Sequence, residues 1–304
     1  MKVSVILPIY NGEKTLKITL NSLIAQTFND FELIACIDGT KDRCKQILLS
    51  YKSSFQKMTI LENEVNLGLG PTMNRLVANT KGKYIAIAEQ DDYYYPDRLQ
   101  LQVALLDRKA DIGLVSGIAE FWNGKKVTSK FPGLLVHKDQ YPEGEELFLL
   151  NYINQTKIVN SCMMFRKSVH IKYGLYFSQH YPNVPIDWAY FLRFSLVSKI
   201  YGLSVILVRL DRRTKRDSVT SKKEIHFKAN RELLRSFYYE YPEIISASIY
   251  QKALRNQKEL ELRSKYSSAF YTSILKTLLH NPFQRVPYSV LYSRLIKKIK
   301  DANE

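Results

Sequence analysis

Three acidic side chains that lie close together in the sequence give the strongest chemical signal. Glu89, Asp91 and Asp92 directly follow an apolar run from Tyr84 to Ala88. Carboxylates crowded in this way repel one another, and a divalent cation or a ring of ligand hydroxyl groups would compensate their charge. We therefore expect Asp91 and Asp92 to bind Mn²⁺ or Mg²⁺. A solvated acidic turn is the simpler alternative.

The residues after this cluster indicate how it is positioned. Pro96 is followed by Leu99, Val103 and Leu106 at helical spacing, which predicts a helix that begins just after the acidic residues. The carboxylates would then lie on a strand-to-helix loop at the carboxyl end of a strand. Open α/β sheets bind their ligands at this edge.

Strand and helix patterns alternate through the first hundred residues. Apolar runs predict strands over 3–9, 31–37, 58–61 and 83–88, and helical spacing predicts helices in the three intervals between them. This order is typical of a Rossmann-like α/β fold with a mostly parallel sheet. No G-x-G-x-x-G follows the first strand, so a dinucleotide oxidoreductase is disfavoured.

The pattern is weaker after this region. Further strands are predicted over 112–122, 161–166 and 203–208, with a short helix from Lys167 towards Gly174 and a longer helix after Asp187. Residues 123–157 have little periodicity and are predicted to be a variable insertion. Helices rich in Lys, Arg and Tyr are predicted from Glu224 onward. We expect a catalytic domain over 1–220 and a basic helical region over 221–304.

The net charge of +16 is concentrated in the last third of the chain, where residues 209–304 contain 21 Lys and Arg against 10 Asp and Glu. Such a bias suits anionic lipid, phosphorylated substrates or nucleic acid. Because no zinc-ligand spacing or RNA-binding signature accompanies it, we expect no nucleic-acid partner. Residues 287–300 form a basic amphipathic pattern that predicts contact with an anionic membrane surface, or else packing on the chain's own core or on a partner subunit in an oligomer.

The cysteines and the hydropathy indicate a compartment. The three cysteines Cys36, Cys44 and Cys162 lie far apart, and no signal-peptide pattern precedes them. We expect reduced, structural thiols in a cytoplasmic protein, with any membrane contact peripheral. No apolar run reaches the length of about 18 residues that a transmembrane helix needs.

Several ordered segments together resemble family 2 glycosyltransferases. They include the opening VSVILPIYNG, the segments QTFNDFEL and IDGT, and the acidic segment EQDDYYYPDRL. The resemblance covers roughly residues 1–220. It implies a GT-A fold, an inverting reaction and a nucleotide-sugar donor, most simply a UDP-sugar.

The resemblance also implies roles for individual residues in donor binding. Asp38 and the strand end from Pro8 to Tyr10 correspond to the uracil-binding edge, and Asp91 and Asp92 to the ribose and metal site. A second group matches other family positions and is assigned to nucleotide binding: Asn66, Asn74, Arg213, Lys215 and Ser218. Lys215 stands where the family has histidine, which removes a potential metal ligand. A solvated basic loop is the alternative for residues 213–218.

Asp187 matches the catalytic base of the family. It precedes a helical run, and Ile186 stands where the family commonly has a first acidic residue. A carboxylate at this position could also serve only as a helix cap. The predicted function is hexosyl transfer from a UDP-sugar to a saccharide or lipid-linked saccharide acceptor in the synthesis of bacterial surface polysaccharide or lipooligosaccharide. A nucleotidyltransferase and a non-catalytic nucleotide-sugar-binding protein are the alternatives.

Overall fold

The apolar run at the N-terminus forms a central strand of a mixed sheet. The computed structural model describes residues 1–131, 140–155, 158–178, 185–213 and 223–264. Within this part of the chain the strands are β1 (Val3–Ile9), β2 (Phe31–Asp38), β3 (Met58–Asn63), β4 (Tyr84–Ile87), β5 (Asp92–Tyr94), β6 (Ile112–Trp122), β7 (Val127–Phe131), β8 (Met164–Arg166) and β9 (Lys199–Asp211).

Helices connect most of these strands. In the described residues they are α1 (Leu16–Ile24), α2 (Cys44–Tyr51), α3 (Leu69–Ala78), α4 (Arg98–Arg108), α5 (Gly144–Asn154), α6 (Lys167–Lys172), α7 (Ile186–Val197), α8 (Lys223–Glu240) and α9 (Ala247–Ser264), with single 3-10 turns η1 (Lys52–Ser54) and η3 (Asn160–Cys162).

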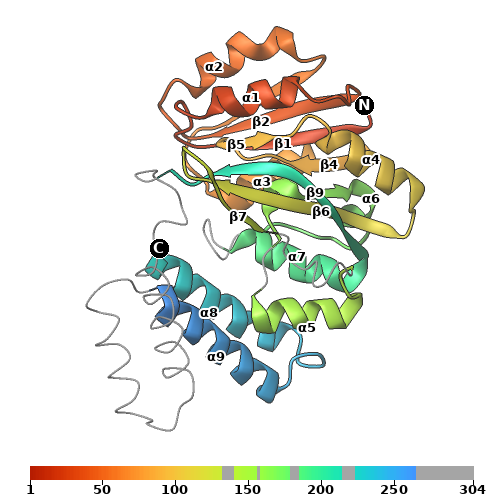
Figure 1. Ribbon diagram of the computed structural model, residues 1–304, viewed down its shortest axis with the longest axis vertical. Helices are drawn as coiled ribbons and strands as arrows, with labels where there is room; N and C mark the ends of the chain where they lie inside the picture. The colour runs from red at the N-terminus through yellow and green to blue at the C-terminus, as the bar shows by residue number, and fades with distance from the viewer. Residues whose placement is uncertain (132–139, 156–157, 179–184, 214–222, 265–304) are drawn as a thin grey trace. The chain divides into compact units, whose positions relative to one another are not determined.

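The strands form one sheet in the order β3-β2-β1-β4-β8-β6-β9-β5, and β7 pairs with β6. β3, β2, β1 and β4 are parallel neighbours, as are β6 and β9, whereas β8 and β5 run antiparallel to the strands beside them. The expectation of a mostly parallel sheet flanked by helices is confirmed (Figure 1).

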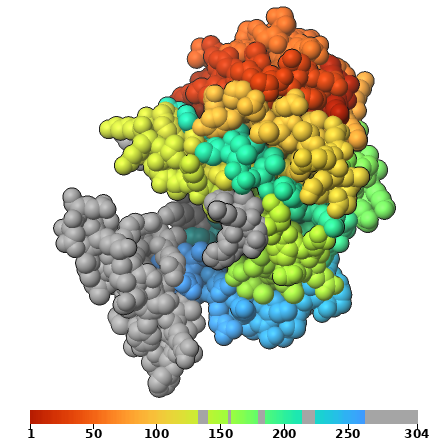
Figure 2. Space-filling model, turned by 45° about the vertical axis from the view of Figure 1, so that its right-hand side comes forward, coloured from red at the N-terminus to blue at the C-terminus, as the bar shows by residue number. Residues whose placement is uncertain are grey.

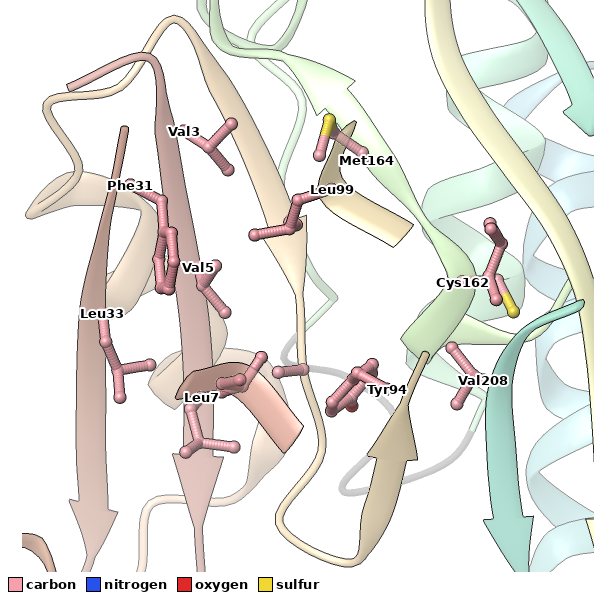
Figure 3. Packing of buried hydrophobic residues seen from close by; sticks show 14 of the residues in the cluster. Val3, Val5, Leu7, Phe31, Leu33, Tyr94, Leu99, Cys162, Met164 and Val208 are labelled. Atoms are coloured by element: carbon pink, nitrogen blue, oxygen red, sulfur yellow. The ribbon is translucent and has the colours of Figure 1, made fainter. Parts of the chain in front are cut away.

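Two apolar cores lie on opposite faces of this sheet. On one face Val5 and Leu7 of β1 pack with residues of α1, α2 and α4, and Figure 3 shows how Leu33 and Leu99 join them from distant parts of the sequence. On the other face Ile6 packs with residues of α3 and α7. Because successive strand residues point to opposite faces, a strand buried on both sides must be apolar throughout. This explains why β1 is a continuous apolar run.

The chain divides into two compact units, which are residues 1–151 with 156–222 and residues 152–155 with 223–304. In the second unit Leu233 and Phe237 of α8 are buried, and Asn230 donates a hydrogen bond to Gln257 Oε1 of α9 at 3.3 Å. The amphipathic pattern predicted over 287–300 lies outside the described residues. Among the described residues no helix is long and apolar enough to cross a membrane.

All three cysteines are buried and free, as the prediction of structural thiols requires. Burial raises the pKa of Cys36 to about 11 and the pKa of Cys44 and Cys162 to about 12. At neutral pH these thiols therefore keep their protons.

Two differences from the expected elements bear on the site. The acidic residues do not lead straight into a helix, because Asp92 to Tyr94 form β5, which pairs antiparallel with residues 208–210 of β9. The segment 123–157, predicted to have little regular structure, contains β7 and α5. The pairing of β5 depends on a strand more than a hundred residues away, which local periodicity does not report. β9 pairs in parallel with the mostly buried β6, and Figure 2 shows teal residues of the chain at the surface next to yellow ones.

Candidate active site

The acidic residues gather at the carboxyl end of β4. Glu89, Asp91 and Asp92 each offer a carboxylate oxygen, and these oxygens lie within 4.8 Å of one another. Glu89 and Asp91 are half-buried, whereas Asp92 is only 1% exposed. The predicted cluster is thus brought together at the ligand-binding edge of the sheet.

Asp92 is the least solvated member of the cluster. Burial raises its pKa well above the usual value, and the nearby charge of Glu89 raises it further. Ser161 donates a hydrogen bond to Asp92 Oδ2, but Asp92 Oδ1 is buried and has no hydrogen-bond partner among the described residues. A buried carboxylate oxygen without a donor is costly. A hard divalent cation would satisfy this oxygen, so the donor set fits Mn²⁺ or Mg²⁺.

A buried arginine lies behind the cluster. Arg98, in the first turn of α4, is 0% exposed and donates hydrogen bonds to the carbonyl oxygens of Ile87 at 2.8 Å and Met163 at 3.2 Å. Its guanidinium lies 4.6 Å from the centre of the Tyr94 ring. Burial lowers the pKa of Arg98, and the charge of Asp92 opposes that change. Arg98 therefore joins β4 to Met163, between η3 and β8, and supplies positive charge close to Asp92.

Asn160 and Ser161 of η3 are further polar residues of the site, and the sequence did not identify them. Asn160 Nδ2 donates to Glu89 Oε1 at 3.0 Å, and Ser161 donates to Asp92. The residues Asn160 and Ser161 precede β8, which pairs antiparallel with β4. Only that pairing brings them to the acidic cluster. A local sequence pattern contains no such signal.

Gln90 connects the acidic loop to the end of β1. The Tyr10 backbone N–H donates to Gln90 Oε1 at 2.8 Å, and Gln90 Nε2 donates to the Tyr10 carbonyl oxygen at 2.7 Å. A Cβ on Gly12 would lie 2.4 Å from Gln90 Oε1, so an alanine at this position would displace the Gln90 amide. Pro8 is buried within β1, and the Tyr10 side chain is 47% exposed. The predicted nucleotide edge and the acidic loop are thus held side by side.

Asp38 organises the neighbouring loop. Its Oδ1 accepts hydrogen bonds from Asn63 Nδ2 at 2.7 Å and from the Leu67 backbone at 2.8 Å, and its Oδ2 accepts from the Gly68 backbone at 3.0 Å. Asn66 Oδ1 also accepts from Gly68, at 2.9 Å. The structure therefore brings Asp38 and Asn66 together, as loop-forming residues at the carboxyl end of β2.

The remaining predicted residues occupy several places. Asn74 of α3 forms hydrogen bonds to the backbone of Phe177. Asp187 lies in the first turn of α7 and is half-buried, and its Oδ1 accepts from the Trp188 backbone at 2.9 Å. Lys215 and Ser218 lie outside the described residues.

Two arginines at the end of β9 differ in their partners. Arg213 Nε donates to Asp211 Oδ2 at 2.8 Å, and this ion pair raises the pKa of Arg213. The charge of the neighbouring Arg212 acts on Asp92 and partly offsets the increase in its pKa. Sequence comparison pointed to Arg213, whereas the electrostatic link to the acidic cluster comes from Arg212.

These elements create an anionic centre that is supported by nearby cations. The carboxylates can coordinate a hard cation, and Arg212 adds positive charge close to where a phosphate group would complete the coordination. Such a site suits the binding of a nucleoside diphosphate together with a metal ion.

Known proteins resemble this chain in sequence and in fold. The sequence model of the family described as "Glycosyl transferase family 2" matches residues 4–174. An uncharacterized glycosyltransferase of Rickettsia prowazekii is 29% identical over 210 residues, which is 68% of this chain and 63% of that protein. The chain thus spans less than two thirds of that relative's length.

Two further proteins have more specific descriptions. The enzyme named UDP-Glc:alpha-D-GlcNAc-diphosphoundecaprenol beta-1,3-glucosyltransferase WfgD, from Escherichia coli, is 29% identical over 129 residues, covering 42% of this chain and 50% of that enzyme. The crystal structure of residues 1–349 of S. aureus TarS in complex with UDP-GlcNAc superposes with a TM-score of 0.69 and 22% identity, over 89% of this chain and 75% of TarS 1–349.

The structural similarity establishes the GT-A fold, and the match of the sequence model extends over more than half of the chain. The opening strand, the Asp-Gly-Thr turn and the acidic loop, recognised first as separate segments, all lie within that match. This chain is a member of glycosyl transferase family 2.

Proposed function

We propose that the protein is an inverting, metal-dependent hexosyltransferase that moves a sugar from a UDP-sugar to a saccharide on a lipid-linked acceptor. The observation that carries the metal-dependent part is the cluster of Glu89, Asp91 and Asp92, in which a buried oxygen of Asp92 has no partner among the described residues. TarS, a structural neighbour, was crystallised with UDP-GlcNAc, which supports a UDP-sugar as donor.

In this proposal the donor lies across the carboxyl ends of β1, β2 and β4. Pro8, Tyr10 and Asp38 form the uracil edge, with Asn66 in the loop that Asp38 holds. Asp91 binds the ribose. For the phosphates we propose a set of residues from the end of β9 and the segment that follows it: Arg212, Arg213, Lys215 and Ser218.

Asp91 and Asp92 would hold the divalent cation, with Glu89 beside them. A bound cation would act as a Lewis acid on the departing diphosphate. Asp187 takes the proton from the acceptor hydroxyl, and the acceptor oxygen forms a bond to the anomeric carbon while the bond from that carbon to the diphosphate breaks. UDP leaves on the opposite side, so the configuration inverts. Carboxylate bases of this kind contribute about 10² to 10⁴ in rate.

The acceptor class rests on a relative and on charge. WfgD is named for an acceptor in which GlcNAc is linked to diphosphoundecaprenol. We propose a similar lipid-linked saccharide, used on the inner face of the plasma membrane in the synthesis of bacterial surface polysaccharide or lipooligosaccharide. The basic residues of 221–304, beyond the catalytic domain over 1–220, would then hold the enzyme at the anionic lipid surface, with roughly 1 kcal/mol for each well-placed cation.

One screen tests the reaction. The chain is incubated with UDP-Glc, UDP-Gal, UDP-GlcNAc or UDP-GalNAc and an α-GlcNAc diphospholipid, with Mn²⁺, with Mg²⁺ or with EDTA. We expect one donor to give acceptor-dependent UDP release with metal and little with EDTA. UDP binding without turnover of any donor would instead favour a non-catalytic binding protein, and equal UDP affinity with and without metal would exclude the metal site.

The membrane part has its own test. Co-sedimentation with vesicles that contain 30% anionic lipid should decrease as salt increases, because exposed charges are screened over a shorter distance. Failure to co-sediment at any salt concentration would contradict peripheral membrane binding while leaving the proposed reaction intact.

A further inference from the structure

A side-chain amide joins α3 to the non-helical segment 175–178, which precedes α7 in the sequence. Asn74 Nδ2 donates a hydrogen bond to the Phe177 carbonyl oxygen at 2.9 Å, and the Phe177 backbone N–H donates to Asn74 Oδ1 at 2.8 Å. Both polar ends of this amide are therefore used by one residue that lies 103 positions away. Such a paired contact fixes distance and orientation together.

The backbones make a second close contact beside this pair. A Cβ on Gly70, one turn earlier in α3, would lie 2.2 Å from the Ser178 carbonyl oxygen. At Gly70 the helix therefore approaches the backbone of residue 178 too closely for a side chain. The position of Phe177 is therefore set by α3 at two neighbouring points.

Phe177 transmits this position to α7. Its ring is 1% exposed and stacks on the ring of Tyr190, with the two centres 4.2 Å apart and the planes at 8°. Tyr190 is fully buried and lies three residues after Asp187, which is in the first turn of α7. Residues at this spacing lie on neighbouring parts of a helix surface. A shift of Phe177 would therefore move the turn that carries Asp187.

We propose that Asn74 is a positioning residue for Asp187, and that it acts through Phe177 and Tyr190 rather than by contact with the nucleotide. This inference rests on the proposed function, in which Asp187 is the catalytic base. A base that is misplaced by about 1 Å can lose about 10²-fold in rate, although the donor site is unchanged. In this role the two hydrogen bonds from the Asn74 side-chain amide to the Phe177 backbone hold Phe177 against Tyr190.

The test compares binding with turnover in the full chain. For Asn74→Ala we expect the Kd for UDP with Mn²⁺, measured by calorimetry, to stay within about twofold of the unmodified protein. We expect kcat to fall at least about 10-fold with the donor identified by the screen, because the base is displaced. Asn79→Ala is the matched control, since the side chain of exposed Asn79, at the end of the same helix, donates a hydrogen bond to the Arg75 carbonyl oxygen of that helix. This control should keep the Kd for UDP and the kcat of the unmodified protein.

A double-mutant cycle tests the route. Phe177→Leu keeps an apolar side chain but loses the stacked ring, and it should lower kcat without changing the Kd for UDP. If Asn74 acts through Phe177, the double variant should be about as slow as the slower single variant. If Asn74→Ala does not fold, Phe177→Leu alone still tests whether this contact controls kcat.

Four results would overturn the inference. A tenfold weaker affinity of Asn74→Ala for UDP would place Asn74 at the nucleotide, and unchanged kcat would remove its positioning role. Multiplying losses in the double variant would show that the two residues act separately. Failure of the unmodified chain to transfer sugar from any donor would reject the proposed function itself, and this inference with it.

Discussion

At the scale of single residues, the proposed base and its structural alternative make different predictions. Asp187 accepts a hydrogen bond from the Trp188 backbone through Oδ1, and an asparagine oxygen can accept the same bond. Asp187→Asn should therefore keep the fold and the affinity for UDP, while sugar transfer falls by at least about 10²-fold. Transfer rates and UDP calorimetry on the same preparation check this expectation. Near-normal transfer would assign the base to another acid.

Arg98 gives a second prediction at this scale. Replacing it with methionine removes the Arg98 donor from the Ile87 and Met163 carbonyl oxygens, of which the Met163 oxygen keeps the Ile87 backbone N–H, and it removes the positive charge close to Asp92. We expect Arg98→Met to lower the free energy of unfolding by about 1 to 3 kcal/mol, the usual cost of leaving a buried acceptor without its donor. The free energy of unfolding is measured by urea titration, with circular dichroism as the signal. Arg108→Met, at the exposed end of the same helix, is the control and should change little.

The sequence identified the acidic cluster and the family from residue types and their order. It could not identify what each side chain contacts. Asn160, Ser161 and Arg212 act on the carboxylates through strand pairing or through space, and no local pattern marks them. Conversely, Asp38 matches a family position, yet its contacts within the chain are to Asn63 and to the backbone of the following loop.

At the scale of elements, the clamp between Gln90 and the end of β1 predicts an unusual pattern of variant effects. In the unmodified protein, Gly12→Ala would push a methyl group against the Gln90 amide and separate β1 from the acidic loop. We expect the affinity for UDP to fall about 10-fold. In a Gln90→Ala background the same change meets no amide, so Gly12→Ala should have little additional effect.

The clamp is checked by calorimetric titration with UDP and Mn²⁺ of four proteins, which are the unmodified chain, Gly12→Ala, Gln90→Ala and the double variant. Equal losses from Gly12→Ala in both backgrounds would show that glycine is needed there for a reason other than Gln90.

The elements themselves were predicted with uneven success. β1 and β2 were placed within one residue, because a strand buried on both faces is a continuous apolar run. β5 was missed, because three residues with acidic and tyrosine side chains form a strand only when β9 pairs with them. β9 was predicted over 203–208 but extends from Lys199 to Asp211, since its exposed and half-buried residues weaken the apolar signal.

At the scale of the whole molecule, one histidine should make stability depend on pH. Burial, together with the charge of Lys167, lowers the pKa of His170 from 6.5 to about 4. Between these pH values the unfolded chain holds a proton on His170 that the folded chain does not. The stability that comes from the neutral, buried imidazole is therefore fully present above pH 6.5 and is lost as the pH falls towards 4. After allowance for partial solvent exposure, the loss is about 2 kcal/mol.

The measurement is the free energy of unfolding in urea at several pH values between 4 and 7. His170→Gln removes this titrating group. The difference in the free energy of unfolding between the unmodified protein and the variant should therefore shrink by about 2 kcal/mol as the pH falls. A constant difference over this range would show that His170 titrates alike in both states. Carboxylates titrate in the two proteins alike, and the comparison cancels them.

The burial of every thiol has a practical consequence for fluorescence work. A fluorophore carrying a maleimide reacts with a thiolate, and the three cysteines are both shielded and protonated at neutral pH. A cysteine introduced at the exposed Lys125, in the turn between β6 and β7, would therefore take the dye selectively. The natural sequence thus already serves as the unreactive background for single-site labelling, and donor binding could be followed optically with the three core thiols left in place.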